Sequence, residues 1–233
     1  MLEVIATSVL DAQLAEMYGA DRIELISGIA EGGVTPSLGL IEKVLQTVRI
    51  PVHVMVRPHA NHFCYDEADL EVMVRDIRLI RDLGAAGIVM GVLGPDGQIN
   101  LEALKTLLQE AGPLSVTFHR AFDEVRDQPA ALRQLARFPA IKRVLTSGGK
   151  RSALDAKHEI AELVRQSREL SVRILAGSGL TVETLDEFIS QTGVTEVHMG
   201  TGVRRNGQAL APIDPDKLKA AAGIIHSYRH RQS

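Results

Sequence analysis

Short apolar runs alternate along the chain with longer amphipathic stretches, a pattern typical of buried strands followed by helices. Strands are expected at Leu2–Ala6, Asp21–Leu25, Val52–Arg57, Gly87–Val92, Leu114–His119, Arg143–Thr146, Arg173–Ala176 and Glu196–Met199. Helices are expected at Val9–Tyr18, Leu38–Val48, Glu67–Leu83, Leu101–Ala111, Pro129–Arg137, Ala153–Leu170, Val182–Gln191 and Pro215–Arg229. Strict alternation indicates a parallel sheet, and eight repeats predict an α/β fold with a single (β/α)8 TIM-type barrel domain over residues 1–233.

The junctions between helix and strand support this division. In residues 18–25, 83–90 and 192–199 a helix ends at a glycine, which suits the left-handed position that closes a helix, and a β-rich run follows. The alternative is an open doubly wound sheet. Such a sheet would normally carry a phosphate-binding fingerprint after its first strand, and Ala6-Thr7-Ser8 is not one.

Polar residues occupy one face of several predicted strands, while the opposite faces are apolar. The polar set is Glu3, Glu24, Arg57, His119, Thr146 and His198. The apolar faces should pack on the helices, which directs the polar set into the barrel. One interpretation is a structural ion-pair cluster, for example Arg57 with Glu3 or Glu24; the other is a substrate pocket with acid–base groups. Because strand C-termini carry function in such barrels, the pocket is favoured.

Glycine-rich turns follow the last predicted strands. The turns after strands seven and eight are Gly177-Ser178-Gly179 and Gly200-Thr201-Gly202. Exposed backbone N–H groups in this part of a barrel commonly hold a phosphate, although tight turns need glycine for conformational reasons as well. We therefore expect either an anion site or simple βα turns.

One predicted loop carries candidate metal ligands. His59, His62 and Cys64 lie within six residues, and imidazole with sulfur suits Cu(I) or Zn²⁺. Their spacing matches no standard zinc module, and loop histidines are also common plain surface residues.

Composition narrows the function classes. The chain has 233 residues, a net charge of −3 and 3% aromatic residues, which argues against a nucleic-acid partner. No apolar run reaches the roughly 20 residues of a membrane span, and the N-terminus does not read as a signal peptide. Cys64 is the single cysteine, so the chain holds no internal disulfide. Together these features predict a cytoplasmic protein without a membrane partner.

Several motifs resemble those of the CutC family over most of the chain. They are Gly19–Leu25, Glu31–Ser37, Pro51–His53 through Arg57-Pro58, Phe63–Tyr65, Thr117–Asp123 and Leu145–Gly148. The resemblance implies a cytoplasmic TIM-type barrel that forms homo-oligomers, commonly dimers, and has a role in copper homeostasis with copper binding. The chain departs from the pattern at Ile5-Ala6-Thr7-Ser8, where family members often carry cysteines. Cys64 stands where the family has one.

Two functional hypotheses follow. The first is copper homeostasis, with Cu(I) bound through Cys64 and a neighbouring residue such as His62. The second is an enzyme acting on a small anionic or phosphorylated metabolite, with Arg57 clamping the anion and Glu24 and His119 moving protons. Its candidate catalytic set is Glu24, Arg57, His119, Arg120, Asp123 and His198, with phosphate held by residues 177–179 and 200–202. A non-catalytic assembly protein would explain neither the polar barrel mouth nor the glycine turns.

Overall fold

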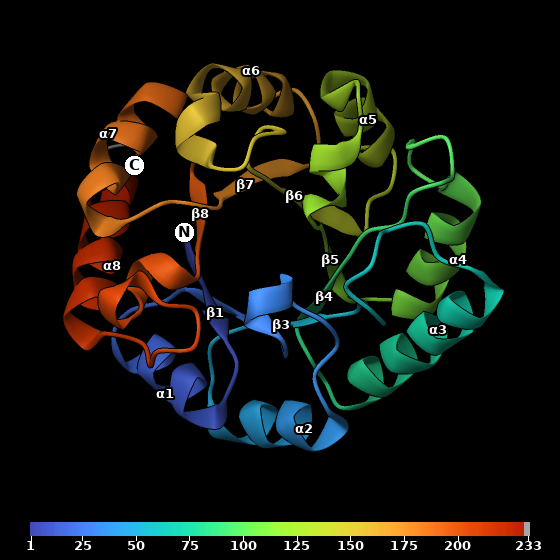
Figure 1. The fold of residues 1–233 in the computed structure, drawn as a ribbon, viewed down its shortest axis with the longest axis horizontal. Helices are drawn as coiled ribbons and strands as arrows, with labels where there is room; N and C mark the ends of the chain where they lie inside the picture. Colours follow the sequence, from blue (N-terminus) through green and yellow to red (C-terminus); the bar gives the residue numbers. More distant parts are fainter. Residues whose placement is uncertain (231–233) are drawn as a thin grey trace.

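The computed structural model describes residues 1–230, with side chains through Tyr228, and residues 231–233 of the predicted domain lie outside the described part. Its parallel strands close into a barrel in chain order, which confirms the predicted (β/α)8 fold (Figure 1). The strands are β1 (Leu2–Ala6), β2 (Arg22–Leu25), β3 (Val52–Met55), β4 (Gly87–Met90), β5 (Ser115–Phe118), β6 (Ile141–Thr146), β7 (Arg173–Gly177) and β8 (Glu196–Met199). The ring closes where β1 pairs with β8, with Glu3 beside His198.

Helices surround this ring. They are α1 (Val9–Met17), α2 (Leu38–Thr47), α3 (Glu67–Asp82), α4 (Leu101–Ala111), α5 (Gln128–Leu135), α6 (Lys157–Ser167), α7 (Val182–Thr192) and α8 (Pro215–His230). Short 3-10 helices lie in the loops: η1 (Ile29–Glu31), η2 (Arg120–Glu124), η3 (Ala153–Ala156), η4 (Thr201–Val203) and η5 (Arg205–Gly207). Side-chain N-caps begin most long helices, at Ser8, Ser37, Asp66, Asn100 and Asp127.

The strand alternation separates two environments. The outward residues, such as Leu2, Val4 and Ile23, are fully buried against the helices in the main core. The inward residues of the same strands, Glu3 and Glu24 among them, are polar and also buried. This division follows from the period-2 pattern and aims the polar set into the barrel as predicted.

Some element boundaries differ from the sequence prediction. Strand β3 ends at Met55 instead of Arg57, because the Arg57 N–H donates to Thr35 Oγ1 at 2.9 Å and the chain leaves the sheet before Pro58. The predicted helix Ala153–Leu170 is divided into η3 and α6. Ser152 Oγ accepts from the Leu154 N–H, and Ala156 then leaves helical geometry with φ −129°.

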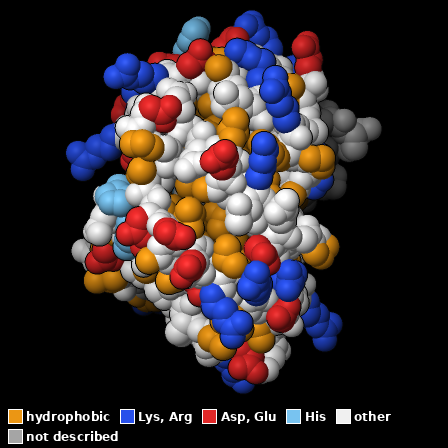
Figure 2. All heavy atoms as spheres, turned by 90° about the vertical axis from the view of Figure 1, so that its right-hand side faces the viewer, with side chains coloured by type: hydrophobic (Ala, Val, Ile, Leu, Met, Phe, Trp, Pro, Cys, Tyr) orange, Lys and Arg blue, Asp and Glu red, His pale blue; other side chains and the backbone are white. Residues whose placement is uncertain are grey.

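The loops at the C-terminal ends of the strands form the barrel mouth. In Figure 1 the short helix η1, from the loop after β2, lies over the middle of the barrel. Among residues 1–230, none of the helices combines the length and apolarity needed to cross a membrane. On the side formed by α3, α4 and α5, acidic and basic side chains are interspersed with apolar ones, without a patch of one charge sign (Figure 2).

Candidate active site

A network of ion-paired side chains occupies the barrel interior on the side away from the mouth. Arg22 Nε donates to Glu3 Oε2, and Arg22 Nη2 donates to Glu196 Oε2 at 3.0 Å. Arg143 Nε reaches the same Glu196 oxygen at 2.8 Å. Burial opposes ionisation of Glu3, but Arg22 and His198 together outweigh it and hold the pKa of Glu3 far below its usual range. The predicted ion-pair cluster therefore exists, but the prediction of Arg57 as its arginine was wrong. Arg22 pairs with Glu3 instead, and it lies on the inward face of β2 together with Glu24.

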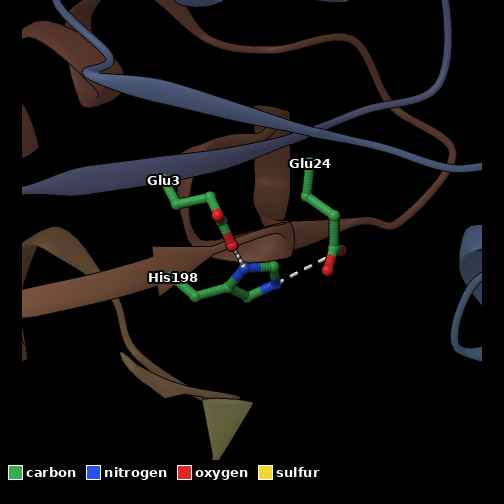
Figure 3. A group of neighbouring side chains, drawn as sticks. All are labelled: Glu3, Glu24 and His198. Atoms are coloured by element: carbon green, nitrogen blue, oxygen red, sulfur yellow. Dashed lines mark hydrogen bonds and ion pairs between the residues drawn. The ribbon is translucent and has the colours of Figure 1, made fainter. Parts of the chain in front are cut away.

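Above this network, three inward side chains meet near the mouth (Figure 3). Glu3 on β1, Glu24 on β2 and His198 on β8 form a group in which the imidazole lies between the two carboxylates. His198 Nδ1 is 2.8 Å from Glu3 Oε1, and His198 Nε2 is 3.7 Å from Glu24 Oε2. The anchored, ionised Glu3 thus fixes the ring and favours a proton on Nδ1, leaving Nε2 facing Glu24.

The pKa values of Glu24 and His198 are both raised. Burial raises the pKa of Glu24 to about 7, and the nearby Glu3 charge adds to the increase while His198 opposes it. For His198, burial is outweighed by Glu24 and Glu3, so its pKa is raised. A carboxyl with a pKa of about 7 beside an imidazole whose pKa is raised is suited to general acid–base chemistry.

A cavity of about 220 Å³ opens above Glu24 and His198. Its walls include both apolar side chains and the glycine-rich turns. The apolar lining includes Ile5, Ile26, Ile29, Met55, Phe63 and Leu180. The polar lining is Glu24, Arg57, His119, Arg120, Ser178, Thr201 and His198, with Gly179, Gly200 and Gly202. The predicted catalytic and anion-binding residues therefore lie around one cavity, except for Asp123 and Gly177.

The two glycine turns approach each other along one wall of the cavity. A Cβ on Gly202 would lie 2.0 Å from the Leu180 carbonyl oxygen, so only glycine permits this approach. Ser178 and Gly179 both adopt positive φ, at 79° and 77°. The backbone N–H groups of Gly179 and Thr201 have no acceptor among the described residues, so they are available to an anion. Gly177 does not line the cavity, and a Cβ there would lie 3.0 Å from His198 Cδ2.

His119 and Arg57 present single unpaired donors. The Ala121 N–H donates to His119 Nδ1 at 3.2 Å, so the neutral ring carries its proton on Nε2, which has no partner. Burial and then the Arg57 charge lower the pKa of His119 to about 3. This arrangement favours His119 as a hydrogen-bond donor over the proton carrier expected from sequence.

Arg57 is anchored by backbone carbonyl oxygens. Its Nη1 donates to Gly33 O at 3.0 Å and to Glu31 O at 3.3 Å, and its Nη2 donates to Ala60 O at 3.2 Å. These bonds join the loops after β2 and β3 and leave only Nε without a partner. Phe63, which sequence reasoning did not assign to the site, packs beneath this guanidinium with 4.7 Å between Arg57 Cζ and the ring centroid.

Arg120 and Asp123 organise the loop after β6. Asp123 accepts from the Ser147 N–H and the Gly149 N–H, and Arg120 Nε pairs with Asp123 Oδ2 at 2.8 Å. Asp123 lines a separate surface cleft, not the cavity, whereas Arg120 borders both the cavity and this loop. Asp123 therefore acts on the site by positioning the loop.

The predicted metal ligands do not form a cage. Cys64 is half-buried and His62 is exposed, with His62 in edge contact with His59 at 4.9 Å between centroids. Within the described side chains, the three-ligand group of His, Cys, Asp or Glu is Glu3, Glu24 and His198. That set contains no sulfur, so its chemistry does not fit the preference of Cu(I) for soft ligands.

Comparison with known proteins agrees with this architecture. The CutC family model matches residues 1–203. A family protein CutC from Yersinia pestis is 43% identical over 201 residues, covering 86% of this chain and 78% of the relative. The human copper homeostasis protein cutC homolog is 46% identical over 198 residues, covering 85% and 72%.

Solved structures give the same result. A CutC protein from Streptococcus agalactiae superposes with a TM-score of 0.81 at 30% identity, covering 85% of this chain and 97% of that one. An N-(5'-phosphoribosyl)anthranilate isomerase from Pyrococcus furiosus has a TM-score of 0.62 at 14% identity, with 97% and 98% coverage, and shares the fold alone.

Proposed function

This chain belongs to the CutC family of copper homeostasis proteins, and we propose that it is an enzyme performing acid–base chemistry on a small phosphorylated metabolite. The observation that carries the proposal is the buried Glu24 carboxyl at the cavity floor. Its Oε1 has no partner, and its pKa of about 7 lets it exist in both protonation states near neutral pH. A purely structural carboxylate would be paired and ionised, as Glu3 is.

His198 and Glu3 support Glu24 as one unit. When Glu24 takes a proton from a substrate, His198 Nε2 lies 3.7 Å away and can stabilise or exchange that proton. Glu3 holds the opposite ring nitrogen at 2.8 Å and compensates the imidazolium charge. Because Glu3 is itself fixed by Arg22, the ring keeps its orientation while the proton moves.

The anion would bind on the glycine-rich wall. Gly179 and Thr201 line the cavity on the turns after β7 and β8, and their backbone N–H groups have no acceptor among the described residues. Such turns are the usual phosphate site of these barrels. Arg120 borders the same cavity and adds a positive charge. The turns therefore support a phosphate group at one end of the substrate, with Glu24 at the other end.

A thermal-shift screen of phosphorylated metabolites tests this function. We expect stabilisation of the wild type by a subset of small phosphate esters, and turnover of one of them that Glu24→Gln abolishes without loss of binding. The exposed Glu71 offers a matched control, because Glu71→Gln should leave turnover unchanged. If no phosphate ester binds the wild type at millimolar concentration, the proposal is refuted.

The second candidate function is Cu(I) binding. It is favoured by the name of the human relative and by the proximity in sequence of Cys64 and His62 on the loop after β3. Competitive Cu(I) titration of the reduced protein against a chromophoric chelator should then give one-to-one binding that Cys64→Ser weakens greatly, while His119→Ala has little effect. Equal affinity of the wild type and Cys64→Ser would remove this candidate.

A cytoplasmic location and a homodimer belong to the same proposal. Both are implied by the family resemblance, and the single cysteine suits a reducing compartment. Sedimentation equilibrium should give a mass of twice 25.3 kDa. A concentration-independent monomer would remove the dimer from the proposal and leave the active site unaffected, because every residue assigned to it lies in one chain.

A further inference from the structure

Three buried polar atoms around the cavity have no partner in the described part of the chain. They are Glu24 Oε1, Arg57 Nε and His119 Nε2. Their side chains are at least nine-tenths buried, with exposures of 2%, 7% and 2%, and all three line the same cavity. Buried polar groups are nearly always hydrogen-bonded in folded proteins, so three such atoms around one cavity indicate a ligand that satisfies them.

The three atoms differ in what they can bind. Arg57 Nε carries a hydrogen and can only donate. His119 Nε2 also donates, because His119 Nδ1 is already the acceptor for the Ala121 N–H. Glu24 Oε1 accepts a hydrogen bond or a proton. The complementary ligand therefore has an oxygen lone pair beside His119 and Arg57, and a removable hydrogen beside Glu24.

Phe63 relates the two donors to each other. Its ring centroid lies 4.8 Å from that of His119 and 4.7 Å from Arg57 Cζ, so both donors pack against the same aromatic side chain. Both donors are therefore held next to the same residue of the cavity wall.

Building on the proposed function, we infer that the substrate is a phosphorylated carbonyl compound whose carbonyl oxygen is bound by His119 Nε2 and Arg57 Nε. Glu24 removes the proton from the adjacent carbon. The C–H electron pair forms a carbon–carbon double bond, and the carbonyl π pair moves to oxygen, giving an enolate held by the two donors. When the adjacent carbon carries a hydroxyl group, its O–H proton passes to the enolate oxygen and a new carbonyl forms there. Return of the proton from the Glu24 carboxylic acid to the former carbonyl carbon then completes an isomerisation without any further reactant.

The neutral state of His119 suits this role. A neutral imidazole can donate a hydrogen bond to the carbonyl oxygen without attracting an anionic substrate through a charge of its own. This hydrogen bond strengthens as negative charge develops on the enolate oxygen. The anchored Arg57 needs no rearrangement to do the same, because three carbonyl contacts already fix its guanidinium. The cavity of about 220 Å³ suits a substrate of a few carbons and one phosphate.

Isothermal titration with two probes tests the inference. The probes are 2-phosphoglycolate, whose carboxylate places oxygens where the carbonyl oxygen would lie, and ethyl phosphate, which lacks them. At pH 6 Glu24 is mostly protonated and does not repel the carboxylate. We expect the wild type to bind 2-phosphoglycolate about 10- to 100-fold more tightly than ethyl phosphate. This is the gain expected from hydrogen bonds that the two donors make to the charged carboxylate.

Two variants test whether His119 causes this preference. His119→Phe keeps an aromatic ring beside Phe63 but has no donor, so the preference should fall to within about threefold while ethyl phosphate affinity is unchanged. His119→Gln keeps a donor and should retain most of the preference. Equal binding of both probes by the wild type, or an unchanged preference in a folded His119→Phe, overturns the inference and leaves the proposed phosphate-binding function standing. Failure of both probes to bind the wild type would overturn the phosphate site itself.

Discussion

Substitution of Glu24 by glutamine should remove an unusual pH dependence of stability. The folded-state pKa of Glu24 is raised from 4.5 to about 7, so the folded protein binds a proton that the unfolded chain has released between these values. Stability contributed by the neutral carboxyl is complete below pH 4.5 and is lost as pH rises through about 7. The wild type therefore loses stability toward alkaline pH through this group, whereas Glu24→Gln is neutral throughout.

The size of the effect follows from the two pKa values. The difference of about 2.5 pH units, at about 1.4 kcal/mol per unit, gives about 3 kcal/mol of destabilisation at pH 8 and about 1 kcal/mol at pH 5. The advantage of Glu24→Gln over the wild type should thus widen by about 2 to 3 kcal/mol between pH 5 and pH 8. Shifted groups whose pKa does not depend on Glu24, such as His53 and His119, remain in both proteins and largely cancel in this difference. His198 is the exception, because Glu24 raises its pKa.

Urea unfolding of both proteins at pH 5, 6, 7 and 8 measures this difference, and the exposed control Glu71→Gln should run parallel to the wild type. Glu3 does not interfere, because its lowered pKa keeps it ionised in the folded state of both proteins over this range. A constant difference between Glu24→Gln and the wild type from pH 5 to pH 8 would refute the reasoning. It would mean that Glu24 is ionised when the protein is folded at neutral pH and is not a neutral-pH acid or base.

Other perturbations test the supporting structure. Arg22→Met should destabilise by about 3–5 kcal/mol in urea unfolding, because it leaves buried carboxylates unpaired, whereas Arg78→Met at an exposed ion pair should cost below about 1 kcal/mol. Gly202→Ala should destabilise and abolish phosphate binding in titrations, since its Cβ meets a carbonyl oxygen at 2.0 Å. Gly223→Ala, with no atom within 4 Å in helix α8, should stabilise by about 1 kcal/mol in the same assay. Asp123→Asn should speed amide exchange of the 147–149 turn measured by mass spectrometry, because its carboxylate accepts from two backbone N–H groups there; unchanged exchange would argue against its positioning role.

The barrel itself could be predicted from the chain because its signals are local. Period-2 alternation places Leu2 and Val4 outward and Glu3 inward whatever the neighbouring strands do. The errors lie at the element ends, where side chains from distant loops decide the geometry. Strand β3 stops early because Thr35, from the loop after β2, takes the Arg57 N–H.

The candidate site was less predictable than the fold. Sequence placed Glu24, His119 and His198 at strand ends, and strand ends converge in a barrel. It named Arg57 as the partner of Glu3 or Glu24 and did not consider Arg22, which lies on the inward face of β2 and binds Glu3. The choice depends on depth along the barrel axis, which the pairing register sets by placing Glu3 beside Arg22.

The sequence alone determined which residues face the barrel interior and which turns need glycine, because both depend on backbone geometry within a few residues. The tertiary structure alone decided the chemical state of each polar group. Glu3 and Glu24 are identical side chains on adjacent strands. Glu3 is ionised beside Arg22, whereas the pKa of Glu24 is raised to about 7. The difference arises from burial and from charges contributed by other strands, and these exist only when the barrel is closed.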